Sequence, residues 1–372
     1  MKNSIFEDLF VLEIANNHWG SVERGKKIIH EYSRVIRHNN VKAAIKFQFR
    51  DVDTFIHPDF TDREDMRYVW KTKNTKLSEE QMSELVDYTR DQGMYPMATC
   101  FDEKSVDLFE KLNLDIMKVA SSDINDWPLL EKIASIRKPT IVSSGGSSLK
   151  DVDDIVSFFK KKDIPLALNH CVSLYPSEDF ELELNQIDFL KNRFPETVIG
   201  FSSHEMTSWQ ASMYMSYAKG ARTWERHVDI DDGNYTVSPY CSLPEQIDEW
   251  LGAYHLAKEM CGAPGTQKRI PVKREVEYLD KLVRGVYAKR DLKIGEKLTS
   301  DDYFMAIPLQ YGQLSCRELV EGETITKEMK VNDPILVDNM DTPYGNNKKM
   351  REKILVRGFD INSGEEGFKP KK

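Results

Sequence analysis

The sequence predicts a parallel α/β barrel of eight strand–helix units, the (β/α)8 or TIM barrel, followed by a small second domain. Three observations favour this architecture. Short apolar runs alternate with amphipathic stretches from residue 9 to about residue 260. Eight of these runs are largely apolar on both faces, as strands buried in a parallel sheet must be. Charged or histidine side chains stand at the carboxyl ends of several runs, where such a barrel has its open face.

The expected strands follow one another in chain order. They cover residues 9–15, 43–49, 95–100, 115–121, 139–145, 165–171, 197–203 and 222–229. Segments with a helical spacing of apolar residues lie between them or after the last, including residues 22–38, 78–92, 103–112, 149–160 and 243–259. Eight such units in about 250 residues match a TIM barrel. A doubly wound open sheet is the alternative, but no Gly-x-Gly-x-x-Gly motif follows the first strand.

The chain is long enough for a second domain after the barrel. We expect the barrel over residues 1–266 and a charged linker around Pro271, over residues 267–281. Short strand-like runs with Gly-Glu turns at Gly295 and Gly322 predict a small domain over residues 282–340. Residues 341–372 form a polar C-terminal extension, whose extreme end we expect to be disordered.

Composition excludes several classes of function. The 372 residues are 40% hydrophobic and carry a formal charge of −9, which argues against a nucleic-acid partner. The five cysteines are scattered and form no Cys-x-x-Cys pair, which indicates reduced thiols. The N-terminus lacks a signal-peptide pattern, and no apolar run is long enough to span a bilayer. We therefore expect a cytoplasmic protein without a membrane partner.

Five residues at the expected strand ends are candidates for an active site: Glu13, Lys46, Lys118, His204 and His227. These side chains should meet because the carboxyl ends of all barrel strands converge on one face. Lysines at a barrel mouth bind phosphate and carboxylate groups. Neutral imidazoles bind divalent transition metals. The combination predicts an anion-binding active site with a metal-capable pair.

Seven motifs in this region resemble those of the sialic acid synthase family. They are EIANNHWG, KFQ, KVASSD, SSGGS, NHCVSLYP, IGFSSH and ERH, and their order and spacing match from about residue 9 to residue 229. The stretch RGVYAKRDLKIGE, from Arg284, resembles the antifreeze-like (SAF) domain of that family. The resemblance implies a transferase of nonulosonic acid biosynthesis. It would condense phosphoenolpyruvate with an aldose, giving a 2-keto-3-deoxy sugar acid and phosphate.

The resemblance also implies a divalent metal, for which we expect Mn²⁺, Co²⁺ or Mg²⁺, and a domain-swapped homodimer. Carried over by motif, the catalytic residues are Glu13, Lys46, Lys118 and Glu225, and the metal ligands are His204 and His227. The implied phosphoenolpyruvate contacts are Thr99, Ser121, Ser143, Ser173 and Ser202, and the implied sugar contacts are Asp123 and Tyr175. His18 and His170 match motif positions that line the site, although either could be structural.

Four positions depart from the family pattern. Ser203 replaces an aspartate beside the metal-binding histidine of many members, and Ser173 replaces an asparagine. Ser238 replaces the aspartate that contacts the sugar. Ile307 replaces the arginine that reaches the partner's site and holds the N-acyl group. Because the motifs for phosphoenolpyruvate are intact, these changes favour an unusual acceptor, not standard N-acetylmannosamine, over an inactive protein.

Two other functions stay open at this point. One is an aldolase barrel that runs in the pyruvate-forming direction and uses Lys118 as a Schiff base. The other is a non-catalytic sugar-binding paralogue that uses the SAF domain for assembly.

Overall fold

The computed structural model describes residues 4–263 and 265–361. The chain divides into two compact units, Met1–Gly262 and Ala263–Lys372. The five cysteines all lie in the described part, and each is a free thiol. No helix in these two described ranges combines the length and apolarity needed to cross a membrane.

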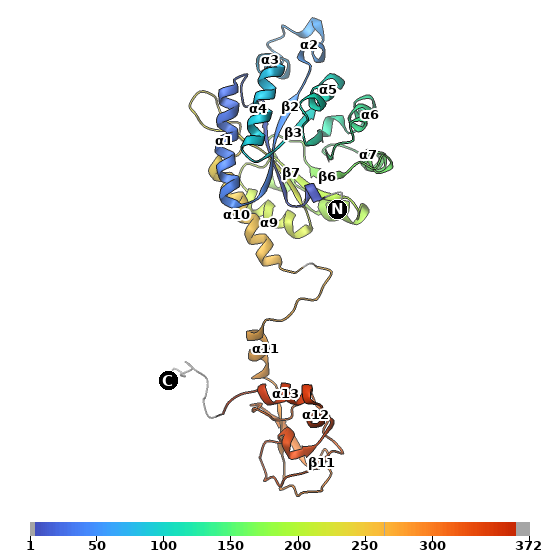
Figure 1. The fold of residues 1–372 in the computed structure, drawn as a ribbon, viewed down its shortest axis with the longest axis vertical. Helices are drawn as coiled ribbons and strands as arrows, with labels where there is room; N and C mark the ends of the chain where they lie inside the picture. Colours follow the sequence, from blue (N-terminus) through green and yellow to red (C-terminus); the bar gives the residue numbers. More distant parts are fainter. Residues whose placement is uncertain (1–3, 264, 362–372) are drawn as a thin grey trace. The chain divides into compact units, whose positions relative to one another are not determined.

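Unit 1 contains a closed barrel of eight parallel strands, with each strand beside the next in sequence and β8 beside β1 (Figure 1). The expected TIM barrel is therefore confirmed, and every expected strand is present to within a few residues at its ends. The strands are β1 Leu9–Ala15, β2 Lys42–Phe49, β3 Tyr95–Cys100, β4 Ile116–Val119, β5 Thr140–Ser143, β6 Leu166–Cys171, β7 Val198–Ser203 and β8 Thr223–His227.

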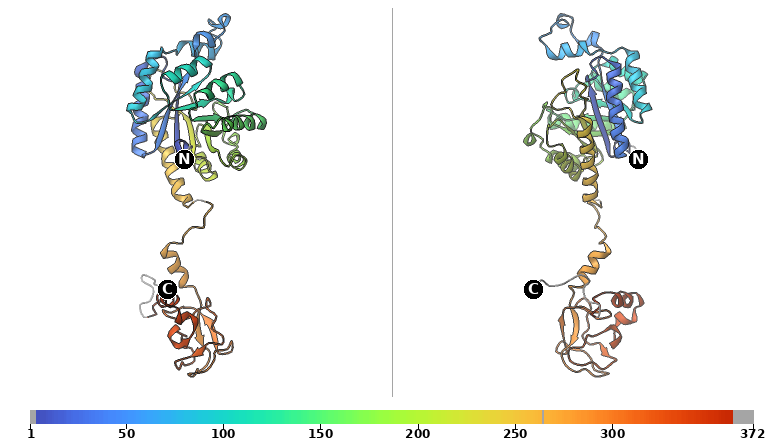
Figure 2. Two further views of the ribbon diagram at one scale, coloured as in Figure 1. Left: turned by 45° about the vertical axis from the view of Figure 1, so that its right-hand side comes forward. Right: turned by 90° about the vertical axis from the view of Figure 1, so that its left-hand side faces the viewer.

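Helices surround the strands in every view of unit 1 (Figure 2). They are α1 Val22–Asn39, α4 Glu79–Asp91, α5 Glu103–Lys111, α6 Trp127–Ser135, α7 Leu149–Lys161, α8 Asn185–Arg193, α9 Trp209–Lys219 and α10 Pro244–Cys261. Short elements fill the loops, namely η1 Ser4–Phe6, α2 Val52–Phe55, η2 Pro58–Phe60, α3 Arg67–Asn74, η3 Ser121–Asp123 and η4 Asp179–Glu181. The segment with α2 and α3 follows β2 and extends beyond that end of the barrel (Figures 1 and 2).

Local sequence explains where several helices begin and end. Ser78 and Ser148 each form a capping box with the residue three positions later. The hydroxyl of Ser21 accepts a hydrogen bond from the backbone of Arg24 at the start of α1. At the end of α9, Gly220 takes the left-handed conformation that closes a helix.

The alternation of side chains along the strands separates two layers. Outward-facing residues such as Phe10, Leu12, Phe47 and Trp224 pack against the helices in the main hydrophobic core. Inward-facing residues fill the barrel near the amino ends of the strands, in a second cluster that includes Val11, Ala44, Met97, Ile116, Ile141 and Ala167. Nearer the carboxyl ends the inward positions become polar. The apolar layer therefore forms the floor of a polar site.

Unit 2 is built from short elements around its own core. They are α11 Lys273–Asp280, β9 Gly285–Ala288, β10 Tyr303–Ala306, β11 Thr324–Ile325, η5 Val337–Asn339, β12 Met340–Asp341, α12 Pro343–Asn346 and α13 Lys348–Val356. Strand β9 pairs with β10 and β11 with β12, both antiparallel. The core includes Val286, Leu298, Leu314, Ile335 and Ile354.

Two segments of unit 2 are more structured than their composition indicates. Helix α11 lies within the expected linker, and Arg317 pairs with its last residue, Asp280, at 2.9 Å. In the C-terminal extension, α13 contributes Ile354 to the core of unit 2, and Arg357 forms two hydrogen bonds with Glu318. The disorder expected at the extreme C-terminus lies outside the described residues.

Candidate active site

Four buried ionisable side chains meet inside the barrel, from β1, β2, β4 and β8. The Lys46 ammonium is 2.8 Å from Oε1 of Glu225 and is also ion-paired with Glu13. Lys118 Nζ lies 3.6 Å from the same Glu225 oxygen and donates a hydrogen bond to Ser143 Oγ at 2.6 Å. The structure thus brings together all four residues expected to be catalytic. Two cations and two anions form one compact charge cluster.

Burial and the opposite charges act against each other in this cluster. Burial lowers the pKa of Lys46 to about 8, although the carboxylate of Glu225 opposes the shift. Burial alone would raise the pKa of Glu225. The attraction of Lys118 and Lys46 outweighs burial and holds the pKa of this carboxyl below its usual range. Glu225 is therefore ionised at neutral pH, and the cluster keeps its carboxylate between the two lysines.

Hydroxyl groups from neighbouring strands surround the cluster. Ser202 on β7 donates to Glu225 Oε1 at 3.2 Å, and Thr99 on β3 pairs in register with Lys118. At the rim, the Ser121 hydroxyl accepts a hydrogen bond from the backbone of Gly145 at 3.0 Å. A Cβ on Gly145 would lie 2.2 Å from the Ser173 hydroxyl oxygen and 2.8 Å from that of Ser121. A side chain at position 145 would therefore require the Ser121 and Ser173 side chains to move.

The two expected metal ligands lie side by side within an aromatic enclosure. The ring centroids of His204 and His227 are 5.4 Å apart. The Tyr175 ring lies 4.0 Å from that of His204, and the Tyr240 ring lies 5.2 Å from that of His227. Burial lowers the pKa of His204 to about 4 and that of His227 well below its usual value. Both imidazoles are therefore neutral at physiological pH and keep a lone pair.

The residues present fit a divalent metal. Nδ1 of His204 lies 2.9 Å from the carbonyl oxygen of Val172. Because a carbonyl oxygen can only accept a hydrogen bond, Nδ1 carries the proton, and the lone pair of Nε2 is available to bind a metal. Oε2 of Glu225 is buried and has no hydrogen-bond partner in the described structure. Within residues 4–263 and 265–361 no group of three or more His, Cys, Asp or Glu side chains could hold a metal ion, so the two histidines would need ligands from outside the chain. Two imidazoles would leave positions open for substrate and water.

The remaining expected site residues have different surroundings. Asp123 lies on η3, where burial raises its pKa and leaves Oδ2 without a hydrogen-bond partner in the described structure. His18 accepts a hydrogen bond from the backbone of Gly20 and lines a small hollow beneath α3, which Gln48 also lines.

His170 does not face the site. Its Nε2 lies 2.7 Å from the carbonyl oxygen of Leu182, and its ring stacks on Phe201. Strand alternation explains this outcome, because Phe201 faces the helical layer and pairs in register with His170. Of the two roles considered for His170, the structural one is therefore correct.

Two side chains on β2 and just beyond it were missed by the sequence analysis. Gln48 donates to Glu13 Oε1 at 3.2 Å, and Arg50 donates to Gln48 Oε1 at 2.9 Å. The Arg50 guanidinium lies 3.7 Å from the centroid of the Phe101 ring. Strand alternation could have identified both residues, because they stand two and four positions after Lys46.

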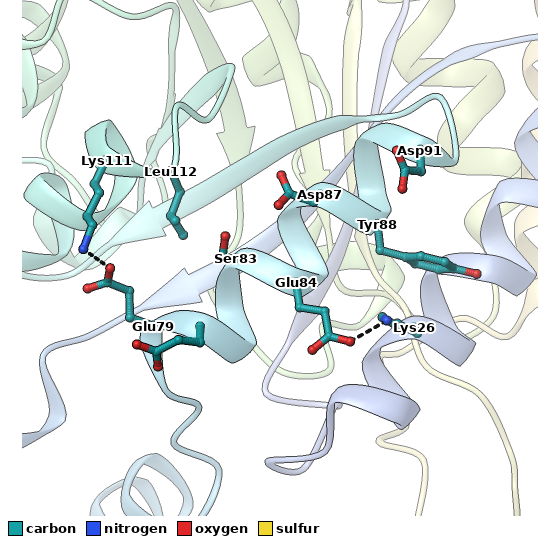
Figure 3. Close-up of a pocket in the computed structure, with 10 residues that line it drawn as sticks. Lys26, Glu79, Ser83, Glu84, Asp87, Tyr88, Asp91, Lys111 and Leu112 are labelled. Carbon is teal, nitrogen blue, oxygen red and sulfur yellow. Dashed lines mark hydrogen bonds and ion pairs between the residues drawn. The ribbon is translucent and has the colours of Figure 1, made fainter.

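A separate hollow on the outer surface is not part of this site. It is lined by side chains of α1, α4 and α5, including Glu79, Glu80, Glu84, Asp87, Asp91 and Lys111 (Figure 3). Lys26 pairs with Glu84 at 2.6 Å, and Lys111 pairs with Glu79. These pairs are partly exposed, so this acidic surface is a solvated face of the helices.

The charge cluster predicts how the substitution Glu225→Gln changes the stability of the protein. The change removes the carboxylate shared by two buried lysines, and breaking a buried pair typically costs roughly 3–5 kcal/mol. We expect a loss of that order in the free energy of unfolding, measured by urea denaturation. Inorganic phosphate should restore more stability to the variant than to the wild type, because it supplies the missing anion.

The matched control is Glu84→Gln, which breaks the partly exposed pair with Lys26. It should cost less than about 1 kcal/mol and show no dependence on phosphate. Equal losses in the two variants, or no phosphate effect in Glu225→Gln, would contradict this description of the cluster.

The chain is similar to several known proteins. An N-acetylneuraminate-9-phosphate synthase of Drosophila melanogaster is 32% identical over 248 residues, which cover 63% of this chain and 64% of that protein. The N,N'-diacetyllegionaminic acid synthase of Campylobacter jejuni is 26% identical over 341 residues, covering 88% and 98% of the two chains.

A crystal structure of a spore coat polysaccharide biosynthesis protein E from Chromobacterium violaceum is also similar. It superposes with a TM-score of 0.86 at 35% identity, covering 90% of this chain and all of that one. Residues 39–263 match the sequence profile of the NeuB family. These findings confirm the resemblance to sialic acid synthases, and the chain belongs to the NeuB family.

Proposed function

We propose that the protein is a transferase that condenses phosphoenolpyruvate with an aldose, giving a 2-keto-3-deoxy sugar acid and phosphate. In this reaction C3 of phosphoenolpyruvate bonds to the aldehyde carbon, water adds at C2 and phosphate leaves. The observation that carries the proposal is the pair of buried lysines beside the neutral histidine pair. Membership of the NeuB family and the names of the synthases among its relatives support the same reaction.

Lys46 and Lys118 would bind the carboxylate and phosphate of phosphoenolpyruvate. Their ammonium groups are desolvated, so each contact to an anion is strong. The hydroxyls of Thr99, Ser121, Ser143, Ser173 and Ser202 are close enough to the lysines or the rim to serve as further donors. The ligand must displace or share the contacts that Glu13 and Glu225 now make.

His204 and His227 would hold a divalent ion, Mn²⁺, Co²⁺ or Mg²⁺, which would polarise the aldehyde oxygen when bound. Oε2 of Glu225, which is buried and accepts no hydrogen bond within the described residues, would orient the water that adds at C2, as a general base. Asp123 and Tyr175 would contact the sugar. We also expect a homodimer in which unit 2 of one protomer closes the barrel of its partner.

The aldolase alternative fits the surroundings of Lys118 poorly. A Schiff base forms when the lysine nitrogen attacks a carbonyl carbon. Lys118 Nζ instead donates to Ser143 Oγ and lies 3.6 Å from the Glu225 carboxylate, so its contacts in the structure are to oxygen acceptors. Borohydride reduction in the presence of pyruvate separates the two mechanisms, because a covalent adduct on Lys118 would establish the aldolase.

The first test is metal-dependent phosphate release. Protein stripped of metal should release no phosphate from phosphoenolpyruvate with any of a panel of hexoses, pentoses and 2,4-diacylamino sugars. Mn²⁺ or Co²⁺ should restore release with at least one of them. His227→Ala should stay folded and gain no activity from Mn²⁺, whereas His255→Ala, at an exposed position on α10, should behave as the wild type. Full activity after chelation would refute the metal role.

The second test concerns the lysines. Lys46→Ala and Lys118→Ala each remove charge-assisted contacts worth roughly 1.5–3 kcal/mol. The apparent affinity for phosphoenolpyruvate should therefore fall about 10- to 150-fold, and far more than the affinity for the aldose. Lys42→Ala is the control, because Lys42 lies at the opposite end of β2 and bonds the backbone of Ser4. An unchanged affinity in the two site variants would place the phosphoenolpyruvate elsewhere.

The third test concerns the acceptor. Ile307, at the family's N-acyl-binding arginine position, is 61% exposed and cannot hydrogen-bond an amide carbonyl, a loss of about 1 kcal/mol or more. We therefore expect N-acetylmannosamine to be a poor substrate. Ile307→Arg should raise activity on it, measured by phosphate release, whereas Leu319→Arg, at another exposed position in unit 2, should not. A wild type that prefers N-acetylmannosamine over other aldoses of its size would contradict this assignment.

A further inference from the structure

A buried ion pair lies behind the two histidines, on the outer face of the barrel wall. Arg226 and Glu205 are 2.9 Å apart, and their side chains are 1% and 0% exposed. They face the layer between the strands and α9, because Glu225 and His227, on either side of Arg226, face the barrel interior. Neighbouring side chains of that layer, such as Phe201 and Trp224, are apolar.

The Arg226 guanidinium joins three segments of chain. It donates from Nε to Ser242 Oγ at 2.9 Å, from Nη1 to Ser203 Oγ at 3.0 Å, and from Nη2 to the carbonyl oxygen of Glu205 at 2.8 Å. From α9, the Ser212 hydroxyl donates to Glu205 Oε1 at 2.5 Å. A planar guanidinium with three bonded nitrogens fixes its partners in distance and in angle.

Each of the three segments supports a histidine. Glu205 and Ser203 flank His204 in the chain, and Arg226 precedes His227 directly. The backbone of Ser242 donates to the carbonyl oxygen of His227 at 2.8 Å. The network therefore connects the backbone of one histidine to that of the other without entering the site.

Stability alone does not explain a charged pair in this layer. Removing two charges from water is costly, and well-packed apolar residues of similar volume commonly give equal or greater stability. The same layer accommodates large apolar side chains at the adjacent strand positions. The pair is not needed to fill this layer, yet it is bonded to both segments that carry the histidines. This combination indicates a role other than stability.

We propose that Glu205 and Arg226 are positioning residues that fix the separation and orientation of His204 and His227. This inference rests on the proposed metal-binding role of the two histidines. Supports behind metal-binding residues typically change metal affinity by 10- to 100-fold when removed. The pair thus tunes the affinity for the divalent ion while touching neither the ion nor the substrate.

The test is the double substitution Glu205→Leu and Arg226→Met, which replaces both charges together and leaves neither unpaired. Mn²⁺ binding to metal-stripped full-length protein is titrated by the loss of the free-ion EPR signal, and the melting temperature is measured alongside. We expect the melting temperature to be kept or raised and Mn²⁺ binding to weaken about 10- to 100-fold. Arg226→Lys, which keeps the charge but loses the planar fork, should bind Mn²⁺ with intermediate affinity.

The control is Glu318→Leu with Arg357→Met, because this pair in unit 2 is also largely buried. This control should keep its Mn²⁺ affinity within about twofold of the wild type. The hydrogen bonds of Glu318 and Arg357 are to residues of unit 2, and substitutions at sites without common partners act independently. Wild-type affinity in the double variant or, if that variant does not fold, in Arg226→Lys would overturn the positioning role alone. A wild type that binds no Mn²⁺ would overturn the proposed metal site and this inference with it.

Discussion

The rest of the site depends on the shared carboxylate of Glu225. Lysines from β2 and β4 are buried in the barrel, where an ammonium group without a counter-charge would lose its proton or destabilise the fold. Glu225 on β8 contacts both, and Glu13 on β1 adds a second anion beside Lys46. These strands are brought together only by closure of the barrel, which pairs β8 with β1 and sets Glu13 in register with His227. Electrostatic balance in the site therefore depends on closure of the barrel.

This cluster would allow a protein with a formal charge of −9 to bind an anion. The field of the whole molecule does not attract a negatively charged ligand, so the attraction must be local. Inside the barrel, low polarity strengthens each contact of the two lysines. In the proposed reaction an entering anion would compete with Glu225 for the same ammonium groups, and the displaced carboxylate would be free to hold water. Anion binding would then also prepare the base.

The sequence predicted the parts that depend on position along a strand. Glu13, Lys46, Lys118 and His227 lie at or near the carboxyl ends of their strands, and alternation turns them inward. It could not predict roles that depend on a partner from another strand. Because Glu225 and His227 face inward, alternation turns Arg226 outward, but nothing in the motif ERH indicates that Glu205 is its partner. The direction of His170 likewise depends on another strand, because it follows from the register of β6 with β7.

The four departures from the family pattern lie in different surroundings. Ser203 faces the outer layer, where its hydroxyl accepts a hydrogen bond from Arg226, so this departure does not lie on the inner face of the barrel. The carboxylate of that layer comes from Glu205 instead. Ser173 packs against Gly145 at the rim, and the loop of Ser238 carries the Tyr240 ring to His227.

The wall on that side of the histidine pair is therefore aromatic and uncharged, from Tyr175 to Tyr240, whose rings are 5.3 Å apart. Aromatic faces favour contact with the C–H face of a sugar, whereas a carboxylate would hold its hydroxyl groups. The substitutions that favour an altered acceptor are therefore Ser173, Ser238 and Ile307, whereas Ser203 lies among the contacts behind the histidines.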